Sequence, residues 1–187
     1  MTHPTDLISV SYDELTANLS KGKIVERRLS EIRDSFLNPD LIDKMPTDED
    51  PIVYRVTAVE PSNGTGDLHY GLGIIYPGKV GPEYFLTKGH LHQARETAEV
   101  YIGLSGEGYM LLENEKTLET RMEPLGKGQI VYVPGHTAHR TVNTGDKPLT
   151  YFGVYPANAG HDYGAIGKRN FLKVIVEENG KPTLKDR

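Results

Sequence analysis

The sequence predicts an all-β protein, an antiparallel sandwich or barrel preceded by a short N-terminal arm. From residue 52 onward, short apolar runs alternate with turn-forming clusters such as PSNGTG, SGEG and NTGDKP. About ten such runs follow one another with no helical pattern between them, which is typical of antiparallel all-β domains. The chain has 187 residues, a length that suits one domain.

The N-terminal part has a different pattern. Residues 1–22 are polar and give no clear periodicity, whereas 23–36 predict a helix because their apolar positions recur at helical spacing. These positions are Val25, Leu29, Ile32 and Phe36. Asn38-Pro39 would end that helix, and a second short one would fit residues 40–44. We therefore divide the single domain into an arm, 1–50, that packs on a barrel, 51–187.

Strands are expected wherever β-branched and aromatic residues cluster between turns. The predicted strands are 52–59, 68–76, 84–87, 89–93, 99–105, 108–113, 118–122, 129–133, 138–143, 149–155 and 171–177.

Composition excludes several functional classes. The 26 acidic and 21 basic residues give a net charge of −5, which argues against nucleic acid or an anionic membrane as a partner. The chain contains no cysteine, so thiolate metal sites and disulfides are excluded. The N-terminus does not resemble a signal peptide, and no apolar run approaches the roughly 20 residues of a membrane helix. We expect a cytoplasmic location.

Histidines carry the chemistry that the sequence suggests. Among the seven, His90 and His92 lie two residues apart in a predicted strand, so both side chains point to one face. Glu99 and Tyr101 share a face of the next strand, and His139 lies on a later one. Three imidazoles and one carboxylate suit a divalent transition metal. An exposed histidine pair without a metal is the alternative for the first motif alone.

Two motifs point to a family. GHLH at 89–92 with Glu99 and Gly106, followed by GQIVYVPGHTAHRTVN at 128–143, resembles the two signature motifs of the cupin superfamily, which implies a double-stranded β-helix, or jelly-roll barrel. His92 and Glu99 are farther apart than in most cupins. YPGKVGPEYFLTKGHLH at 76–92, AHRTVN at 138–143 and AGHDYG at 159–164 resemble the cupin-type glucose-6-phosphate isomerases first known from archaea.

This resemblance implies residue roles. The ligands of one divalent metal ion per subunit would be His90, His92, Glu99 and His139, with iron favoured and nickel, manganese, cobalt or zinc as alternatives. Tyr101, His161 and Tyr163 would line the sugar end of the pocket. The other positions near substrate would be Tyr54, Thr87, Gly89 and Tyr155, the last three at the phosphate end. Gly73 stands where the family has a threonine, which removes one expected phosphate contact.

The implied activity is metal-dependent interconversion of glucose 6-phosphate and fructose 6-phosphate, in glycolysis and gluconeogenesis. The metal would take up the O1 and O2 oxygens of the substrate, and the hydrogen would move through an enediol or as a hydride. Glu99 is the candidate base, with Tyr101 and His161 as alternatives for proton relay. Alternatives are an isomerase of another phosphosugar such as mannose 6-phosphate, a non-catalytic sugar-phosphate-binding cupin, and an iron oxygenase.

The remaining candidates have ordinary structural explanations. Lys88 and Arg95 are expected to be solvated, His136 to be a turn residue at the pocket rim, and His3 and His69 to lie at the surface. Tyr132 and Tyr151 are expected in the core or an interface. An apolar outer face is expected from Val100, Ile102, Val131 and Val133. Because such a face must be covered, we expect a homodimer built by sheet packing or strand exchange.

Overall fold

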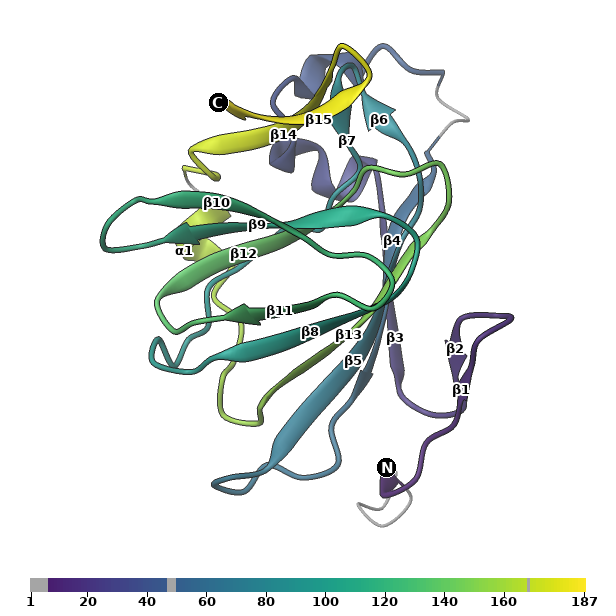
Figure 1. The fold of residues 1–187 in the computed structure, drawn as a ribbon, viewed down its shortest axis with the longest axis vertical. Helices are drawn as coiled ribbons and strands as arrows, with labels where there is room; N and C mark the ends of the chain where they lie inside the picture. The colour runs from purple at the N-terminus through teal and green to yellow at the C-terminus, as the bar shows by residue number, and fades with distance from the viewer. Residues whose placement is uncertain (1–6, 47–49, 168) are drawn as a thin grey trace.

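The computed structural model describes residues 7–46, 50–167 and 169–187, and it consists mainly of β-strands in facing layers (Figure 1). The larger layer has six strands in the order β11-β8-β13-β5-β4-β3, and every neighbouring pair in it is antiparallel. Its strands are β3 (Lys23–Arg28), β4 (Ile52–Val59), β5 (Leu68–Ile75), β8 (Glu99–Ser105), β11 (Ile130–Val133) and β13 (Leu149–Pro156).

The opposite layer is built from shorter sheets. Three strands run in the order β10-β9-β12, and isolated bridges join Leu86 to Val142 and His90 to His139. A four-stranded sheet, β15-β14-β7-β6, extends this side. The strands are β6 (Lys79–Val80), β7 (Glu83–Tyr84), β9 (Gly108–Asn114), β10 (Thr120–Pro124), β12 (Thr137–Asn143), β14 (Lys173–Glu178) and β15 (Lys181–Asp186). A core of buried aliphatic and aromatic side chains fills the space between the layers.

The remaining elements are small. Strands β1 (Tyr12–Asp13) and β2 (Asn18–Leu19) form a hairpin that stands beside the main body in Figure 1. Two 3₁₀ helices, η2 (Ser30–Ser35) and η3 (Pro39–Leu41), precede β4, and one short helix, α1 (Gly164–Gly167), precedes β14. No helix in the described ranges is long and apolar enough to cross a membrane.

The predicted helix over 23–36 is wrong. Residues 23–28 form β3, which pairs with β4, and only the following residues turn into the 3₁₀ helix η2. The open edge of β4 offers backbone partners that a surface helix could not use, and this tertiary pairing overrides the helical spacing. Three of the apolar side chains that predicted the helix still pack in the core, because Leu29, Ile32 and Phe36 are all buried. The division into arm and barrel at residue 50 stays a prediction.

Most predicted strands are confirmed. Strands 52–59 and 99–105 match β4 and β8, and seven others match with shifts of one or two residues at their ends. The two predicted strands at 84–87 and 89–93 are largely irregular, with pairing only at residues 83–84 and at single bridges. Strand β15 was not expected because its sequence, KPTLKD, is polar and contains proline.

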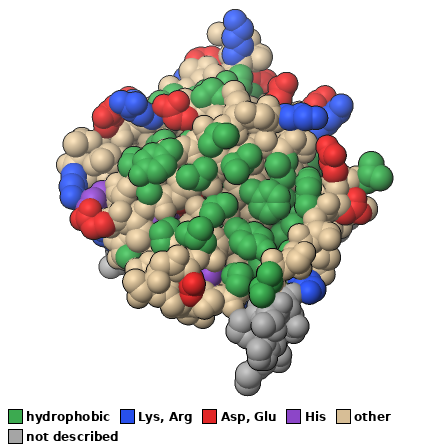
Figure 2. All heavy atoms as spheres, turned by 60° about the horizontal axis from the view of Figure 1, so that its bottom comes forward, with side chains coloured by type: hydrophobic (Ala, Val, Ile, Leu, Met, Phe, Trp, Pro, Cys, Tyr) green, Lys and Arg blue, Asp and Glu red, His purple; other side chains and the backbone are tan. Residues whose placement is uncertain are grey.

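The outer face of the six-stranded sheet is apolar, but its membership differs from the prediction. Val131 and Val133 pair with Tyr101 and Glu99 and are buried inside. The outward residues of β11 are instead Ile130 and Tyr132, which are 69% and 62% exposed. They pair with Ile102 and Val100 on β8, which are half-buried. Figure 2, which brings the lower side of Figure 1 forward, shows apolar side chains spread over one face of the molecule.

Candidate metal centre and active site

Four side chains from three segments converge inside the barrel. His90 and His92 come from the irregular segment after β7, Glu99 begins β8, and His139 lies in β12. Their ligand-type atoms all lie within 4.8 Å of one another. Glu99 Oε2 is 3.2 Å from Nε2 of His92 and 3.2 Å from Nε2 of His139. The predicted ligand set therefore forms one cluster.

Backbone carbonyls fix the orientation of two imidazoles. Nδ1 of His92 lies 3.0 Å from the carbonyl oxygen of Thr97, and Nδ1 of His139 lies 3.1 Å from that of Thr137. A carbonyl only accepts, so each Nδ1 must carry the proton and donate it. Each Nε2 then points into the cluster toward Glu99, and once it carries no proton its lone pair is able to bind a metal ion, the arrangement in which histidine binds metals.

The third imidazole, His90, is held by packing. Its ring centroid lies 4.3 Å from that of His139 and 4.4 Å from that of His161. Burial and then its histidine neighbours lower the pKa of His90 well below its usual value, so the ring is neutral. Nε2 of His90 and Nε2 of His139 are buried with no hydrogen-bond partner among the residues that the structure describes. Unpaired buried nitrogens are costly, and a cation at this position would satisfy both.

Glu99 is ionised in this setting. Burial would raise its pKa, but contacts with His139 and His92 outweigh burial and lower the pKa to about 2. The carboxylate fits because its neighbour on β13 is Gly153, where a Cβ would lie 2.7 Å from Oε1 of Glu99. Burial, and next the charge of Glu99, raise the pKa of Tyr101 well above its usual value, so this buried phenol stays protonated.

A loop after β13 brings two more predicted residues to the cluster. His161 stacks on Tyr163 with ring centroids 5.9 Å apart and lies 5.6 Å from the ring of Tyr155. Both His161 and Tyr163 are exposed, so they lie at the mouth of the site. Tyr155 contacts the rings of His161 and His69, which places it on the His161 side of the barrel.

Two of the three predicted phosphate residues, Thr87 and Gly89, lie in the segment that leads to His90. Thr87 pairs with β12: its backbone N–H donates to Thr141 at 2.9 Å, and its Oγ1 accepts from the Thr141 N–H at 3.0 Å. Gly89 has φ +76, and a Cβ there would meet Phe171 at 2.7 Å and Arg140 at 3.0 Å. Only glycine fits both demands.

Tyr54 completes this wall. It is buried, and burial raises the pKa of its phenol to about 12. The backbone of Lys88 hydrogen-bonds to that phenol, so Tyr54 lies against the turn that contains Thr87 and Gly89. Beside it, a hollow of about 130 Å³ is lined in part by Lys88, Gly89 and Tyr163.

Two arginines position these loops, and the sequence did not reveal them. The buried Arg140 packs 4.3 Å from the Phe171 ring and donates to the Lys88 carbonyl at 2.7 Å. Arg95, expected to be solvated, is only 29% exposed and lies 2.5 Å from the carboxylate of Asp162. Its guanidinium also donates to the carbonyl of His92. Local sequence gives little sign of these roles because Asp162 is 67 positions from Arg95 and Lys88 is 52 positions from Arg140.

The other histidines have separate settings. His136 has φ +59 and lies 2.7 Å from both Glu115 and Glu96, so it is a turn residue held by carboxylates and lies outside the four-residue cluster. The prediction that His69 lies at the surface is wrong: it is buried and Nε2 lies 2.8 Å from the Ser62 carbonyl. His3 lies outside the described residues. Lys88 is exposed, as expected.

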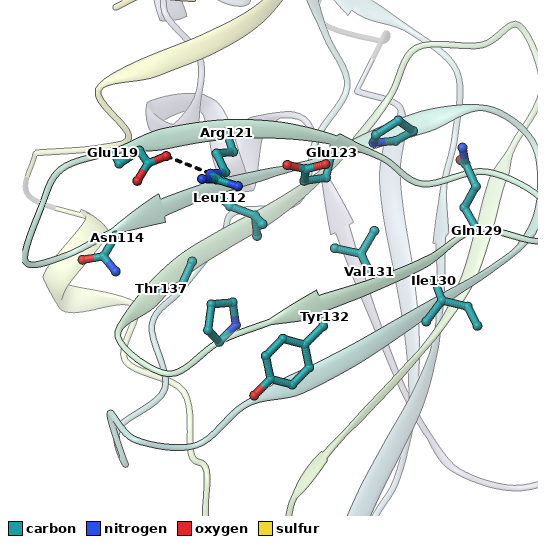
Figure 3. Close-up of a pocket in the computed structure, with 12 residues that line it drawn as sticks. Leu112, Asn114, Glu119, Arg121, Glu123, Gln129, Ile130, Val131, Tyr132 and Thr137 are labelled. Carbon is teal, nitrogen blue, oxygen red and sulfur yellow. Dashed lines mark hydrogen bonds and ion pairs between the residues drawn. The ribbon is translucent and has the colours of Figure 1, made fainter.

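A larger groove lies elsewhere, between β10 and β11 (Figure 3). It measures about 640 Å³, with Leu112 and Val131 in its wall, and Arg121 on β10 forms an ion pair at 2.8 Å with Glu119, the residue just before that strand. None of its lining residues belongs to the predicted site. Size alone therefore does not identify the active site in this protein.

The fold and the buried cluster of three histidines and a glutamate define a cupin. A solved structure of oxalate oxidase matches with a TM-score of 0.52 at 14% identity, covering 67% of this chain and 62% of that one, which supports the fold. The sequence model of the family "Glucose-6-phosphate isomerase (GPI)" matches residues 26–186.

Sequence relatives agree with the family model. A glucose-6-phosphate isomerase of Pyrococcus abyssi is 46% identical over 179 residues, which cover 96% of this chain and 94% of the relative. One of Thermococcus litoralis is 46% identical over 177 residues, covering 95% and 93%. One of Sinorhizobium medicae is 39% identical over 132 residues, covering 71% and 61%. The chain belongs to the glucose-6-phosphate isomerase family, and it is an enzyme.

Proposed function

We propose that this enzyme interconverts glucose 6-phosphate and fructose 6-phosphate at the His90, His92, Glu99 and His139 cluster, with one divalent metal ion per subunit. The family supports the isomerase reaction. The observation that best supports a bound metal ion is that Nε2 of His90 and Nε2 of His139 are buried without a hydrogen-bond partner among the described residues, beside the ionised carboxylate of Glu99. Iron is our first choice, and nickel, manganese, cobalt and zinc also suit this ligand set.

A bound divalent ion would act as a Lewis acid that stabilises negative charge developing on the substrate oxygens next to C1 and C2. The protein prepares for this because backbone carbonyls hold His92 and His139 through Nδ1, so that each Nε2 is directed toward Glu99 and the proposed metal position. Their fixed orientation removes reorganisation from the reaction.

The proton chemistry falls to groups beside the cluster. Glu99 is ionised and is therefore able to accept the C2 hydrogen as a proton, which gives an enediol route. Tyr101 donates a hydrogen bond to Glu99 and keeps its proton, so it can hold the carboxylate in place or pass a proton between substrate oxygens. His161 at the mouth is the second candidate for that relay. A hydride shift needs none of these groups as a base.

The substrate is held along the barrel axis in this proposal. Tyr101, His161, Tyr163 and Tyr155 surround its sugar end, and Thr87, Gly89 and Tyr54 surround its phosphate end. The φ +76 at Gly89 shapes a tight turn beside Thr87, and such turns bind phosphate oxygens through backbone N–H groups. The position of Tyr155 near His161 favours a sugar contact over the phosphate contact that we first expected for it.

We also propose a homodimer, a cytoplasmic location and a role in glycolysis and gluconeogenesis. The exposed Ile130 and Tyr132 on an apolar outer face support the homodimer, because monomers rarely expose large apolar patches. The family supports the metabolic role.

The test is to strip the enzyme with EDTA, add single divalent metals, and follow conversion of fructose 6-phosphate, with mannose 6-phosphate as a parallel substrate. We expect activity to vanish and return with at least one metal, and fructose 6-phosphate to be preferred. Preference for mannose 6-phosphate would assign another phosphosugar. A metal-loaded enzyme without isomerase activity would indicate a non-catalytic sugar-phosphate-binding protein.

A further inference from the structure

A glycine in one strand leaves a space that a tyrosine of the neighbouring strand fills. Gly73 on β5 pairs with Tyr151 on β13. A Cβ placed on Gly73 would lie 2.5 Å from Oη and Cε2 of Tyr151 and closer still to Cζ. The phenol of Tyr151 therefore occupies the space that any side chain at position 73 would need. Tyr151 is only 6% exposed, so its hydroxyl belongs to the barrel interior.

Strand geometry gives the position of this hydroxyl relative to the metal cluster. Gly153, two residues along β13 from Tyr151, lies directly against Glu99. Residues two apart share a face and are separated by about 7 Å along a strand. Tyr155 lies two residues beyond Gly153 on the side away from Tyr151, and its ring is next to that of His161. Tyr151 thus lies inside the barrel, beyond the cluster and away from its mouth residue His161.

Other hydroxyl groups gather at the same end. The Thr141 hydroxyl hydrogen-bonds to the Tyr151 phenol, and the Thr141 backbone N–H donates to Oγ1 of Thr87. The ring of Tyr101 lies 5.4 Å from that of Tyr151. Burial raises the pKa of Tyr151, so the phenol keeps its proton. The protonated phenol therefore carries an O–H that is able to donate to a ligand oxygen.

We propose that the Tyr151 hydroxyl, placed by the missing side chain at Gly73, is a specificity-determining contact to the phosphate group of the substrate. The inference rests on the proposed function. If C1 and C2 of a hexose 6-phosphate lie at the metal cluster, its phosphate lies at the far end of the molecule. Tyr151 and Thr87 line that end, and an O–H donor to a phosphate oxygen is a strong, charge-assisted hydrogen bond.

The test is Tyr151→Phe, which removes the hydroxyl and keeps the ring that packs over Gly73. Binding of the unreactive ester sorbitol 6-phosphate is measured by calorimetry on the metal-loaded enzyme, beside binding of sorbitol. We expect affinity for the ester to fall by about tenfold or more. KM for fructose 6-phosphate should rise by a similar factor, whereas kcat should change less than threefold. Gly73→Ala, which displaces the phenol, should lower affinity for the ester in the same direction.

Tyr109→Phe, on β9, serves as the matched control and should leave both values unchanged. If Tyr151→Phe binds the ester within twofold of the original enzyme, the proposal is overturned. It is equally overturned if the variant loses affinity for sorbitol by the same factor, because the contact is then not with phosphate. Calorimetry needs no turnover. A chain that binds the ester through Tyr151 but does not isomerise fructose 6-phosphate would therefore refute the proposed function and keep this contact.

Discussion

The guanidinium of Arg95 lies 2.5 Å from the carboxylate of Asp162, and this ion pair ties together two loops that are 67 positions apart in the chain. Asp162 stands between His161 and Tyr163, and Arg95 also donates to the carbonyl of His92. Backbone hydrogen bonds between Leu91 and Asp162 reinforce the connection. These contacts hold the loop with His161 and Tyr163, at the mouth of the site, against the segment that contains the proposed metal ligand His92.

Asp162→Asn should loosen this mouth. The amide keeps an oxygen for the Ala165 N–H, but it loses the charge that faces Arg95. Because the pair is less than one-third exposed, we expect kcat/KM to fall by about tenfold. The variant should still bind one metal ion per chain. Arg121→Gln, which removes the exposed pair with Glu119, is the control and should have normal kinetics. Normal kinetics in Asp162→Asn would show that the ion pair does not position the loop.

Removing a metal ligand should abolish metal binding. His139→Ala deletes one of the two unpaired buried Nε2 atoms, and we expect metal affinity to fall by more than about 100-fold, since even changes beside ligands cost 10- to 100-fold. Metal content after dialysis measures this directly. The control is His136→Asn, three residues earlier. Asparagine tolerates the φ of +59 at this position, so this variant should retain the metal. Equal metal content in both variants would rule out His139 as a ligand.

Gly89→Ala should damage the predicted phosphate turn. An alanine there would be strained at φ +76 and would also collide with Phe171 and Arg140. Gly128→Ala is a matched control, because Gly128 has φ +82 but no atom within 4 Å of the added Cβ. Both should lose stability from backbone strain, of order 1–3 kcal/mol. Only Gly89→Ala should also raise KM, by about tenfold. Thermal melts and steady-state kinetics separate the two effects, and parallel kinetics in both variants would contradict the role of Gly89.

His136 should make stability depend on pH. Hydrogen bonds to Glu115 and then Glu96 raise the pKa of His136 above its usual value near 6.5. A raised histidine pKa means that the folded state binds the proton more tightly, so the stabilisation is complete below pH 6.5. It is lost as pH rises through the folded pKa. The difference in Tm between the original protein and His136→Asn should therefore be largest in mild acid and shrink at alkaline pH. A difference that is constant or grows with pH would contradict the assignment.

The apolar outer face should hold two copies together. Changing Ile130, 69% exposed, to Glu would place a charge in the expected interface. Light scattering should show a dimer for the original protein and a monomer for the variant, because an unpaired buried charge opposes association. Leu118→Glu, on an exposed turn outside this sheet, should remain dimeric. A monomer in the original protein would refute the homodimer.

Local sequence patterns predicted most strands, and the four residues that we expected to bind a metal lie together. Alternating apolar residues mark β4 and β8, and His90 and His92 lie in one cluster although their segment is irregular and is not the strand that we expected. The helix over 23–36 failed because the free edge of β4, which is invisible in a local window, captured residues 23–28. Arg95, Arg140 and Tyr151 were undervalued for the same reason. Their roles depend on partners brought together only by the fold, such as Gly73 beneath the Tyr151 ring.

The most direct test of the central claim is a titration of stripped enzyme with a single divalent metal while isomerisation of fructose 6-phosphate and bound metal are both measured. We predict that activity rises in proportion to bound metal and levels off at one ion per chain, and that Glu99→Gln neither binds the ion tightly nor gains activity. Full activity in enzyme shown to be free of metal, or activity in Glu99→Gln equal to that of the original protein, would contradict the account.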